Sequence, residues 1–377
     1  MIFSPLGTAL LPFLAFPITY GYNYILKQTN DHRVVFGVAV GIMALIGLLF
    51  FLASKLSAQR SRPKDPLYYV FTLFAFTGMV DLITSLEIDG FIQGFMEVYL
   101  KEGEPYLKTA HCTLACYYDG TVHLVMYVVL AIRCLQNQDN RNLGLYWCGS
   151  MANIVLVFLL GNVIGKYSDD VKMSYLLTIP YMIVPVVVAM VLMRRPRRQM
   201  KLNKEQVKFI QEQDILTRPL DILLITYLLF AIFIASLRGL AALDCTWPSV
   251  QGYLARFEPY IGDPVGYPRI QMLMYLLYYV PYYAATICGL VIPGQEWMLD
   301  WSILHAGATS QAQVIHICAS FHKRTLSSFR PPPPGRKGFL LVNMSLQLVP
   351  QILAWRCNGR PEFFSKISVD DTNKKDA

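Results

Sequence analysis

The sequence predicts an all-α polytopic membrane protein with about ten transmembrane helices. Of its 377 residues, 54% are hydrophobic and only 15% are charged, and the mean hydropathy is +0.39. A soluble domain has about 25% charged residues, so the charged surface that solubility requires is missing. Membrane-spanning helices have such a composition because a charged side chain is expensive inside the bilayer.

Ten apolar runs are long enough to cross the bilayer, which takes about 20 helical residues. They lie near residues 5–26, 34–53, 67–86, 110–132, 144–164, 175–193, 219–237, 270–291, 302–320 and 338–355. The first run has no basic start and no small-residue cleavage site, so we interpret it as a retained helix rather than a signal peptide. The run at 302–320 is the most polar, and we expect it inside a bundle or beside a cavity.

Loop charges orient these helices. The loops at 54–66 and 194–218 are basic, whereas the loop at 87–109 holds five acidic residues. The positive-inside rule places the two basic loops in the cytosol and the acidic loop on the other side. Ten helices then place both termini in the cytosol. The basic loop at 321–337 disagrees with this arrangement, because it falls on the lumenal side. The net charge of +8 is explained by such loops, and no nucleic-acid partner is expected.

The chain ends in Lys374-Lys375-Asp376-Ala377. Two lysines at the third and fourth positions from a cytosolic end form the dilysine signal that returns membrane proteins to the endoplasmic reticulum. This tail agrees with the predicted topology, so Lys374 and Lys375 are candidate targeting residues.

The sequence contains an internal duplication, and we use it to divide the chain into domains. Three short motifs recur in the same order: Glu-Pro-Tyr at 104–106 and 258–260, Pro-Leu at 66–67 and 219–220, and Val-Pro at 184–185 and 349–350. We divide the chain into two leading helices (1–65), a first four-helix bundle (66–196), a basic cytosolic linker (197–218), a second four-helix bundle (219–361) and a cytosolic tail (362–377). Both bundles begin on the cytosolic face, so the repeat is parallel rather than inverted.

Polar side chains form stripes on several of the predicted helices. In the fourth helix Asp119, His123 and Tyr127 are spaced four apart and fall on one face. One interpretation is an intramembrane pocket; the other is hydrogen bonding between helices, worth ~0.6 kcal/mol per bond. The residues that we predict to bind a ligand are Asp81, Asp119, His123, Tyr127, Gln313 and His316.

Motifs for cofactors, metals and soluble-type catalysis are absent. There is no P-loop, no G-x-S-x-G, no H-E-x-x-H and no glycine-rich nucleotide turn. The eight cysteines show no zinc spacing and no disulfide framework. We therefore expect no cofactor and no metal.

Several segments across nearly the whole chain resemble the transmembrane 6 superfamily. They lie at 87–97, 101–107, 116–123, 144–147, 161–167, 267–273 and 360–364. The resemblance implies two EXPERA domains, the four-helix module shared with the sterol Δ8–Δ7 isomerase (emopamil-binding protein) and the sigma-2 receptor. It also implies residence in the endoplasmic reticulum and the ER–Golgi intermediate compartment, with a role in triglyceride secretion and lipid-droplet content. The implied partners are a membrane lipid or sterol and proteins of lipid secretion.

The sequence departs from the isomerase where catalysis needs acids. The isomerase carries a histidine followed four residues later by a glutamate, and a second glutamate on the next helix. His123 matches that histidine, but Tyr127 replaces the first glutamate, and the helix at 144–164 has no acid. His123 and Asp119 are the remaining candidates for catalysis. We predict a lipid-binding regulator of lipid metabolism; the alternatives are a sterol isomerase and a membrane scaffold that binds no lipid.

Overall fold

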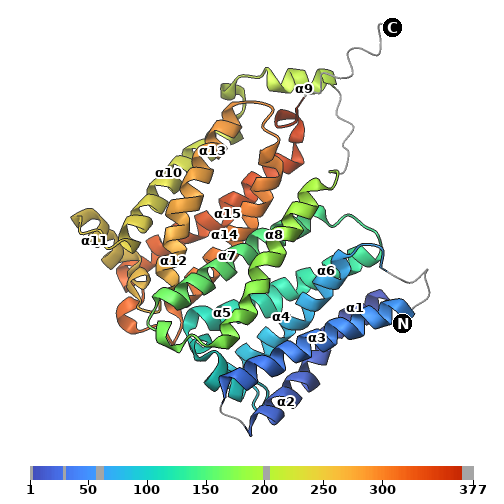
Figure 1. The fold of residues 1–377 in the computed structure, drawn as a ribbon. Helices are drawn as coiled ribbons and strands as arrows, with labels where there is room; N and C mark the ends of the chain where they lie inside the picture. The colour runs from blue at the N-terminus through green and yellow to red at the C-terminus, as the bar shows by residue number, and fades with distance from the viewer. Residues whose placement is uncertain (1–2, 29–30, 57–62, 198–203, 367–377) are drawn as a thin grey trace, which may run out of the picture.

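The computed structural model describes residues 3–28, 31–56, 63–197 and 204–366, and its described part is built from helices joined by turns (Figure 1). The helices are α1 (Pro5–Leu10), α2 (Ala15–Leu26), α3 (His32–Leu56), α4 (Leu67–Ile88), α5 (Ala110–Tyr118), α6 (Leu124–Leu135), α7 (Arg141–Ile164), α8 (Ile179–Arg194), α9 (Lys204–Gln211), α10 (Pro219–Ala242), α11 (Pro248–Phe257), α12 (Tyr267–Met274), α13 (Val280–Val291), α14 (Trp297–Phe321) and α15 (Arg336–Gly359). The predicted polytopic all-α fold is confirmed.

Within the described residues, nine helical segments are long and apolar enough to cross a membrane. They correspond to nine of the ten predicted runs. The tenth run lies in α14, which is 25 residues long but too polar to qualify by composition. Its polar side chains His305, Thr309, Gln313 and His316 are all buried. As the sequence predicts, α14 therefore lies inside the helical assembly, where protein rather than lipid surrounds it.

The second helix of each proposed bundle has the same irregularity. A π-helical segment at Asp119–His123 joins α5 to α6, and another at Tyr275–Tyr279 joins α12 to α13. The two segments begin 156 positions apart, close to the spacing of the recurring motifs. A π-helical turn inserts one extra residue and is often found at functional sites. The division into two bundles remains our proposal, but α5–α6 and α12–α13 share this local geometry.

Helices α7 and α14, the third of each proposed bundle, cross at glycines. A methyl group on Gly149 would collide with the backbone carbonyl of Leu304, and one on Gly307 would collide with the carbonyl of Tyr146. Small residues allow two helices in a membrane to approach this closely. The same two helices run in the same direction, as the ion pair between Arg141 and Asp300 at their N-terminal ends shows. The crossing therefore fixes the two halves of the molecule against each other.

Ion pairs show which loops share an end of the molecule. At one end, Asp65 before α4 pairs with Arg195 after α8. At the opposite end, Arg324 after α14 pairs with Asp89 after α4, with an N–O distance of 2.8 Å. The basic loop at 321–337 thus lies beside the acidic loop, as ten helices require. Its positive charge is partly neutralised by Asp89, which explains how this loop breaks the charge rule.

Asp89, the acid that pairs with this basic loop, has a lowered pKa. Burial alone would raise the pKa of Asp89, but the Arg324 guanidinium holds that pKa below its usual range. The candidate targeting residues Lys374 and Lys375 lie outside the described residues. The eight cysteines all lie within the described part and are free thiols, so no disulfide framework forms among them.

Candidate functional site

A cavity of about 560 Å³ lies in the first half of the molecule, between the leading helices and α4, α5, α7 and α8. Ligand pockets typically have volumes of about 300–1,000 Å³, so the space is large enough for one small amphiphile. Most of its wall is apolar. Its ionisable carboxyl groups come from Asp81, Glu104 and Asp119, and none of the lining residues is lysine, arginine or histidine.

Two poorly packed helices form the lipid-facing side of the cavity. Phe36, Ala39 and Met43 of α3 line it, as do Pro180 and Tyr181 of α8. Among the candidate spans of the described residues, those containing α3 and α8 are the least buried, with 6% and 17% of positions buried. The side of the cavity formed by α3 and α8 is therefore the one covered by the least buried helices of the assembly.

Asp119 presents one carboxylate oxygen to the cavity and holds the other in a buried network. Its Oδ1 accepts hydrogen bonds from His123 Nδ1 and from the Tyr127 hydroxyl, both at 2.8 Å. Its Oδ2 is buried without a hydrogen-bond partner, and Asp119 lines the cavity. An unpartnered buried oxygen is costly. The arrangement therefore leaves one acceptor available for a ligand.

His123 and Tyr127 do not line the cavity. His123 is fully buried, and its Nε2 lies 2.7 Å from the Ser150 hydroxyl on α7. Tyr127 is also fully buried and packs edge-on against Trp147. Both residues contact Asp119 from the side away from the cavity. They are positioned to orient the carboxylate rather than to touch a ligand.

Asp81 on α4 lines the same cavity and interacts with the Asp119 carboxyl group. The two helices approach closely here, because a side chain on Gly120 would collide with Leu82. Gly78, one turn before Leu82 on α4, leaves room for Asp119, whose Oδ2 would lie 3.2 Å from an added Cβ. The structure thus brings together two of the predicted residues, Asp81 and Asp119, in one wall.

Glu104 is a cavity residue that the sequence reasoning missed. It belongs to the 87–109 loop, immediately precedes the 3₁₀ turn Pro105–Lys108 and lines the cavity. Glu104 is only 5% exposed, and its Oε1 has no hydrogen-bond partner. Burial raises the pKa of its carboxyl group to about 7, although the neighbouring Tyr106 and Tyr99 act in the opposite direction. The sequence did hold a signal, since Glu104 belongs to the repeated Glu-Pro-Tyr motif.

Gln313 and His316 lie on α14 in the second half of the molecule and do not line this cavity. Gln313 hydrogen-bonds with the Tyr275 hydroxyl. His316 Nε2 lies 2.7 Å from Glu258 Oε2. The structure therefore separates these two predicted residues from Asp81 and Asp119, and it places them in buried polar networks of the second bundle.

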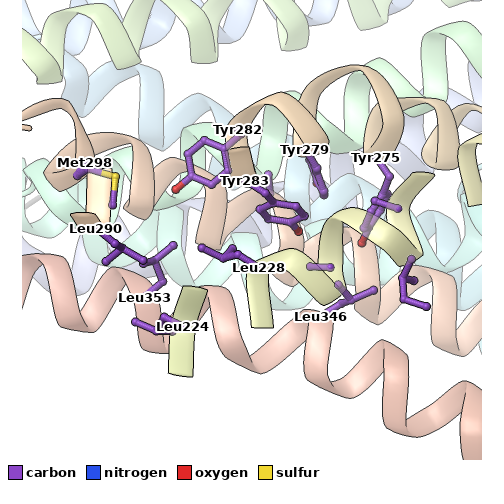
Figure 2. Close-up of a cluster of buried hydrophobic side chains, with 14 of the residues drawn as sticks. Leu224, Leu228, Tyr275, Tyr279, Tyr282, Tyr283, Leu290, Met298, Leu346 and Leu353 are labelled. Atoms are coloured by element: carbon purple, nitrogen blue, oxygen red, sulfur yellow. The ribbon is translucent and has the colours of Figure 1, made fainter. Parts of the chain in front are cut away.

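The corresponding space in the second bundle is filled by aromatic side chains. Figure 2 shows Tyr275, Tyr279, Tyr282 and Tyr283 packed among leucines of α10 and α15. Beside Tyr283 and His305 only about 10 Å³ remains, roughly the volume that a single water needs. The ligand-sized cavity described above thus lies in the first of the two proposed bundles.

Comparison with known proteins gives a consistent result. The family model described as "Transmembrane 6 superfamily member 2-like, transmembrane domain" matches residues 14–203. The curated mouse (Mus musculus) protein named Transmembrane 6 superfamily member 2 is 42% identical over 98% of this chain and 97% of its own length. The human (Homo sapiens) protein of the same name is 41% identical over 96% of this chain and 95% of its own length. No solved structure matches the chain. The family resemblance noted in the sequence is confirmed.

Proposed function

This chain belongs to the transmembrane 6 superfamily, and we propose that it binds a sterol or another membrane lipid in the cavity of its first bundle. By this binding it regulates lipid metabolism in the endoplasmic reticulum membrane, including triglyceride secretion and lipid-droplet content. The observation that carries the proposal is the cavity itself, with an apolar wall and three carboxyl groups. Its location on the early secretory route follows from the predicted tail signal and remains part of the proposal.

The chemistry of the cavity favours a lipid over a water-soluble ligand. Its wall is mostly apolar, and α3 and α8 separate it from bilayer rather than from water. An apolar wall accommodates hydrocarbon, whereas it would leave the polar groups of a water-soluble ligand without hydrogen-bond partners. The unpartnered oxygens of Asp119 and Glu104 accept hydrogen bonds, so a hydroxyl or amine at the polar end of the lipid fits them. A mainly hydrocarbon molecule with one small polar group matches both features.

A blocked cavity tests this proposal. Ala39 of α3 lines the cavity, whereas Leu45 on the same helix is exposed and does not line it. The full-length protein is reconstituted in phosphatidylcholine nanodiscs and exposed to a photo-activatable sterol. We expect Ala39→Trp to remove most crosslinking and Leu45→Trp to leave it at the wild-type level.

The two alternatives give different results in related experiments. Absence of bound lipid in the wild type supports a scaffold that binds no lipid, and equal crosslinking of wild type and Ala39→Trp contradicts binding in this cavity. Conversion of a Δ8 sterol by the wild type supports the isomerase. In hepatocyte-like cells that lack the protein, we expect the wild type and Leu45→Trp to support more triglyceride secretion than Ala39→Trp.

A further inference from the structure

The second bundle shows what a buried glutamate at the Glu-Pro-Tyr motif needs. Glu258 is fully buried there, and its carboxylate binds the Arg238 guanidinium. It also lies 2.7 Å from His316 Nε2 and 3.1 Å from Asn343 Nδ2. Burial would raise the pKa of Glu258, but Arg238 and His316 lower it to about 2. The glutamate is thus satisfied entirely by side chains of its own bundle.

The first bundle lacks all three of these partners. At the spacing of 153–154 residues that relates the repeated motifs, Arg238 corresponds to Thr84 or Ser85, whose hydroxyl groups donate to carbonyls of their own helix. Gly149 and Gly307, the glycines at which α7 and α14 cross, are 158 residues apart. The same spacing relates His316 to Phe158. The spacing of the repeated Val-Pro motif relates Asn343 to Thr178. Thr84, Phe158 and Thr178 all line the cavity.

The cavity therefore occupies the place where the second bundle puts the partners of its glutamate. Glu104 shares one backbone contact with Glu258: its carbonyl accepts from the Leu107 N–H at 3.1 Å, as the Glu258 carbonyl accepts from the Ile261 N–H at 3.0 Å. Its Oε1 has no partner. The titratable groups that interact with it come from each neighbouring element: Tyr22, Asp81, Tyr99, Tyr106, Cys112, Cys116, Tyr175, Tyr181 and Tyr267. None of these is a base, and no lysine, arginine or histidine of the described residues forms an ion pair with Glu104.

We propose that Glu104 controls the occupancy of the cavity: its carboxylate accepts a hydrogen bond from the hydroxyl or amine of the bound lipid, and its protonation releases that lipid. The proposal rests on the proposed lipid-binding function. The ligand supplies to Glu104 the donor that Arg238 supplies to Glu258. Because burial places the pKa of Glu104 at about 7, a modest acidification changes its charge.

The direction of the effect follows from this chemistry. A hydrogen bond to a charged acceptor is roughly twice as strong as one to a neutral acceptor. Loss of the charge should weaken binding by about tenfold, since such bonds contribute about 1.5–3 kcal/mol. The carboxylate predominates above about pH 7, so affinity should be high in mildly alkaline buffer and low in mildly acidic buffer. A lipid taken up at neutral pH would be released in a more acidic compartment.

The test measures binding of a fluorescent sterol, dehydroergosterol, to the full-length protein in phosphatidylcholine nanodiscs at about pH 8 and about pH 6. The wild type should bind about tenfold more weakly at the lower pH. Glu104→Gln should bind with the same affinity at both values. Glu97→Gln is the matched control, because Glu97 lies in the same loop, is half-exposed and pairs with Lys27. It should retain the pH dependence of the wild type.

A second variant supplies the missing donor from the protein itself. Thr84→Arg introduces the guanidinium that the second bundle carries, and it should abolish sterol binding at both pH values while the protein still melts cooperatively. Binding by the wild type with no pH dependence, or pH dependence retained in Glu104→Gln, overturns the role of Glu104 but leaves the proposed function standing. Absence of sterol binding by the wild type at either pH, with no co-purifying lipid, overturns the proposed function instead.

Discussion

Replacing His123 with alanine removes two hydrogen bonds from the wall behind the cavity. His123 is fully buried and bridges Asp119 Oδ1 at 2.8 Å and the Ser150 hydroxyl at 2.7 Å. After the substitution Asp119 keeps the bond from Tyr127, while Ser150 loses the imidazole of His123. A buried group left without its partner costs about 1–3 kcal/mol. The lost ring also leaves a cavity. We expect a total loss of about 3 kcal/mol in the free energy of unfolding.

The assay is thermal melting of the detergent-solubilised protein, followed by tryptophan fluorescence. A loss of about 3 kcal/mol should lower Tm by roughly 4 °C in a chain of 377 residues. Asp119→Asn is the matched variant, because asparagine keeps one oxygen for His123 and Tyr127 and changes the atom that faces the cavity. It should melt close to the wild type and bind the sterol probe more weakly. An unchanged Tm for His123→Ala together with complete loss of probe binding would refute this reasoning, since His123 would then contact the ligand directly.

Three further predictions follow from the same structure. The pKa of Glu104 is raised from 4.5 to about 7 in the folded protein. The ligand-free protein should therefore lose up to about 3 kcal/mol of stability as the pH rises from about 4.5 to about 7. Glu104→Gln should flatten the dependence of Tm on pH between about 5 and 8. Gly307→Leu should prevent the close crossing of α7 and α14, because even a methyl group at this position collides with the Tyr146 carbonyl. Its size-exclusion profile should show misfolded aggregate, whereas Leu341→Ala on the exposed face of α15 should elute like the wild type. The wild type should not restore Δ8–Δ7 sterol conversion in cells lacking their own isomerase, because His123 is enclosed by Asp119 and Ser150; conversion that is lost in Asp119→Asn would favour the enzyme.

Hydrophobic run length predicted the spanning helices well, because the thickness of the bilayer sets their length. The predicted run at 110–132 lies within α5, its π-helical segment and α6, which together cover 110–135. The polar run at 302–320 is buried, because hydrogen-bonding side chains cannot face lipid. Charge counting left the 321–337 loop unexplained, since the pairing of Arg324 with Asp89 depends on contacts between distant segments.

The candidate site was predicted only in part, for reasons of local geometry. Regular helical spacing places Asp119, His123 and Tyr127 on one face. The three side chains do meet, since His123 and Tyr127 both contact Asp119 Oδ1, but only Asp119 lines the cavity. A stripe of polar residues also does not reveal whether its face meets a cavity or another helix. Gln313 is an example, because it meets Tyr275.

Glu104 was missed because an acid in a polar loop looks like a solvated charge. Its burial depends on the neighbouring Tyr99–Gly103 segment and α5, and also on the leading helices, which are distant in the sequence. The contrast between Glu104 and Glu258 appears only when the partners of each are known. The proposed duplication relates the two glutamates, whereas packing pairs Glu258 with Arg238 and places Glu104 at the cavity.

The central claim is that the first bundle holds a lipid. The most direct test is quantitative lipidomics, with native mass spectrometry, of the purified full-length protein and of its Ala39→Trp and Leu45→Trp variants. We expect one lipid species to co-purify with the wild type and with Leu45→Trp in an amount close to that of the protein, and to be absent from Ala39→Trp. The same lipid content in all three proteins, or no retained lipid in the wild type, would contradict the account.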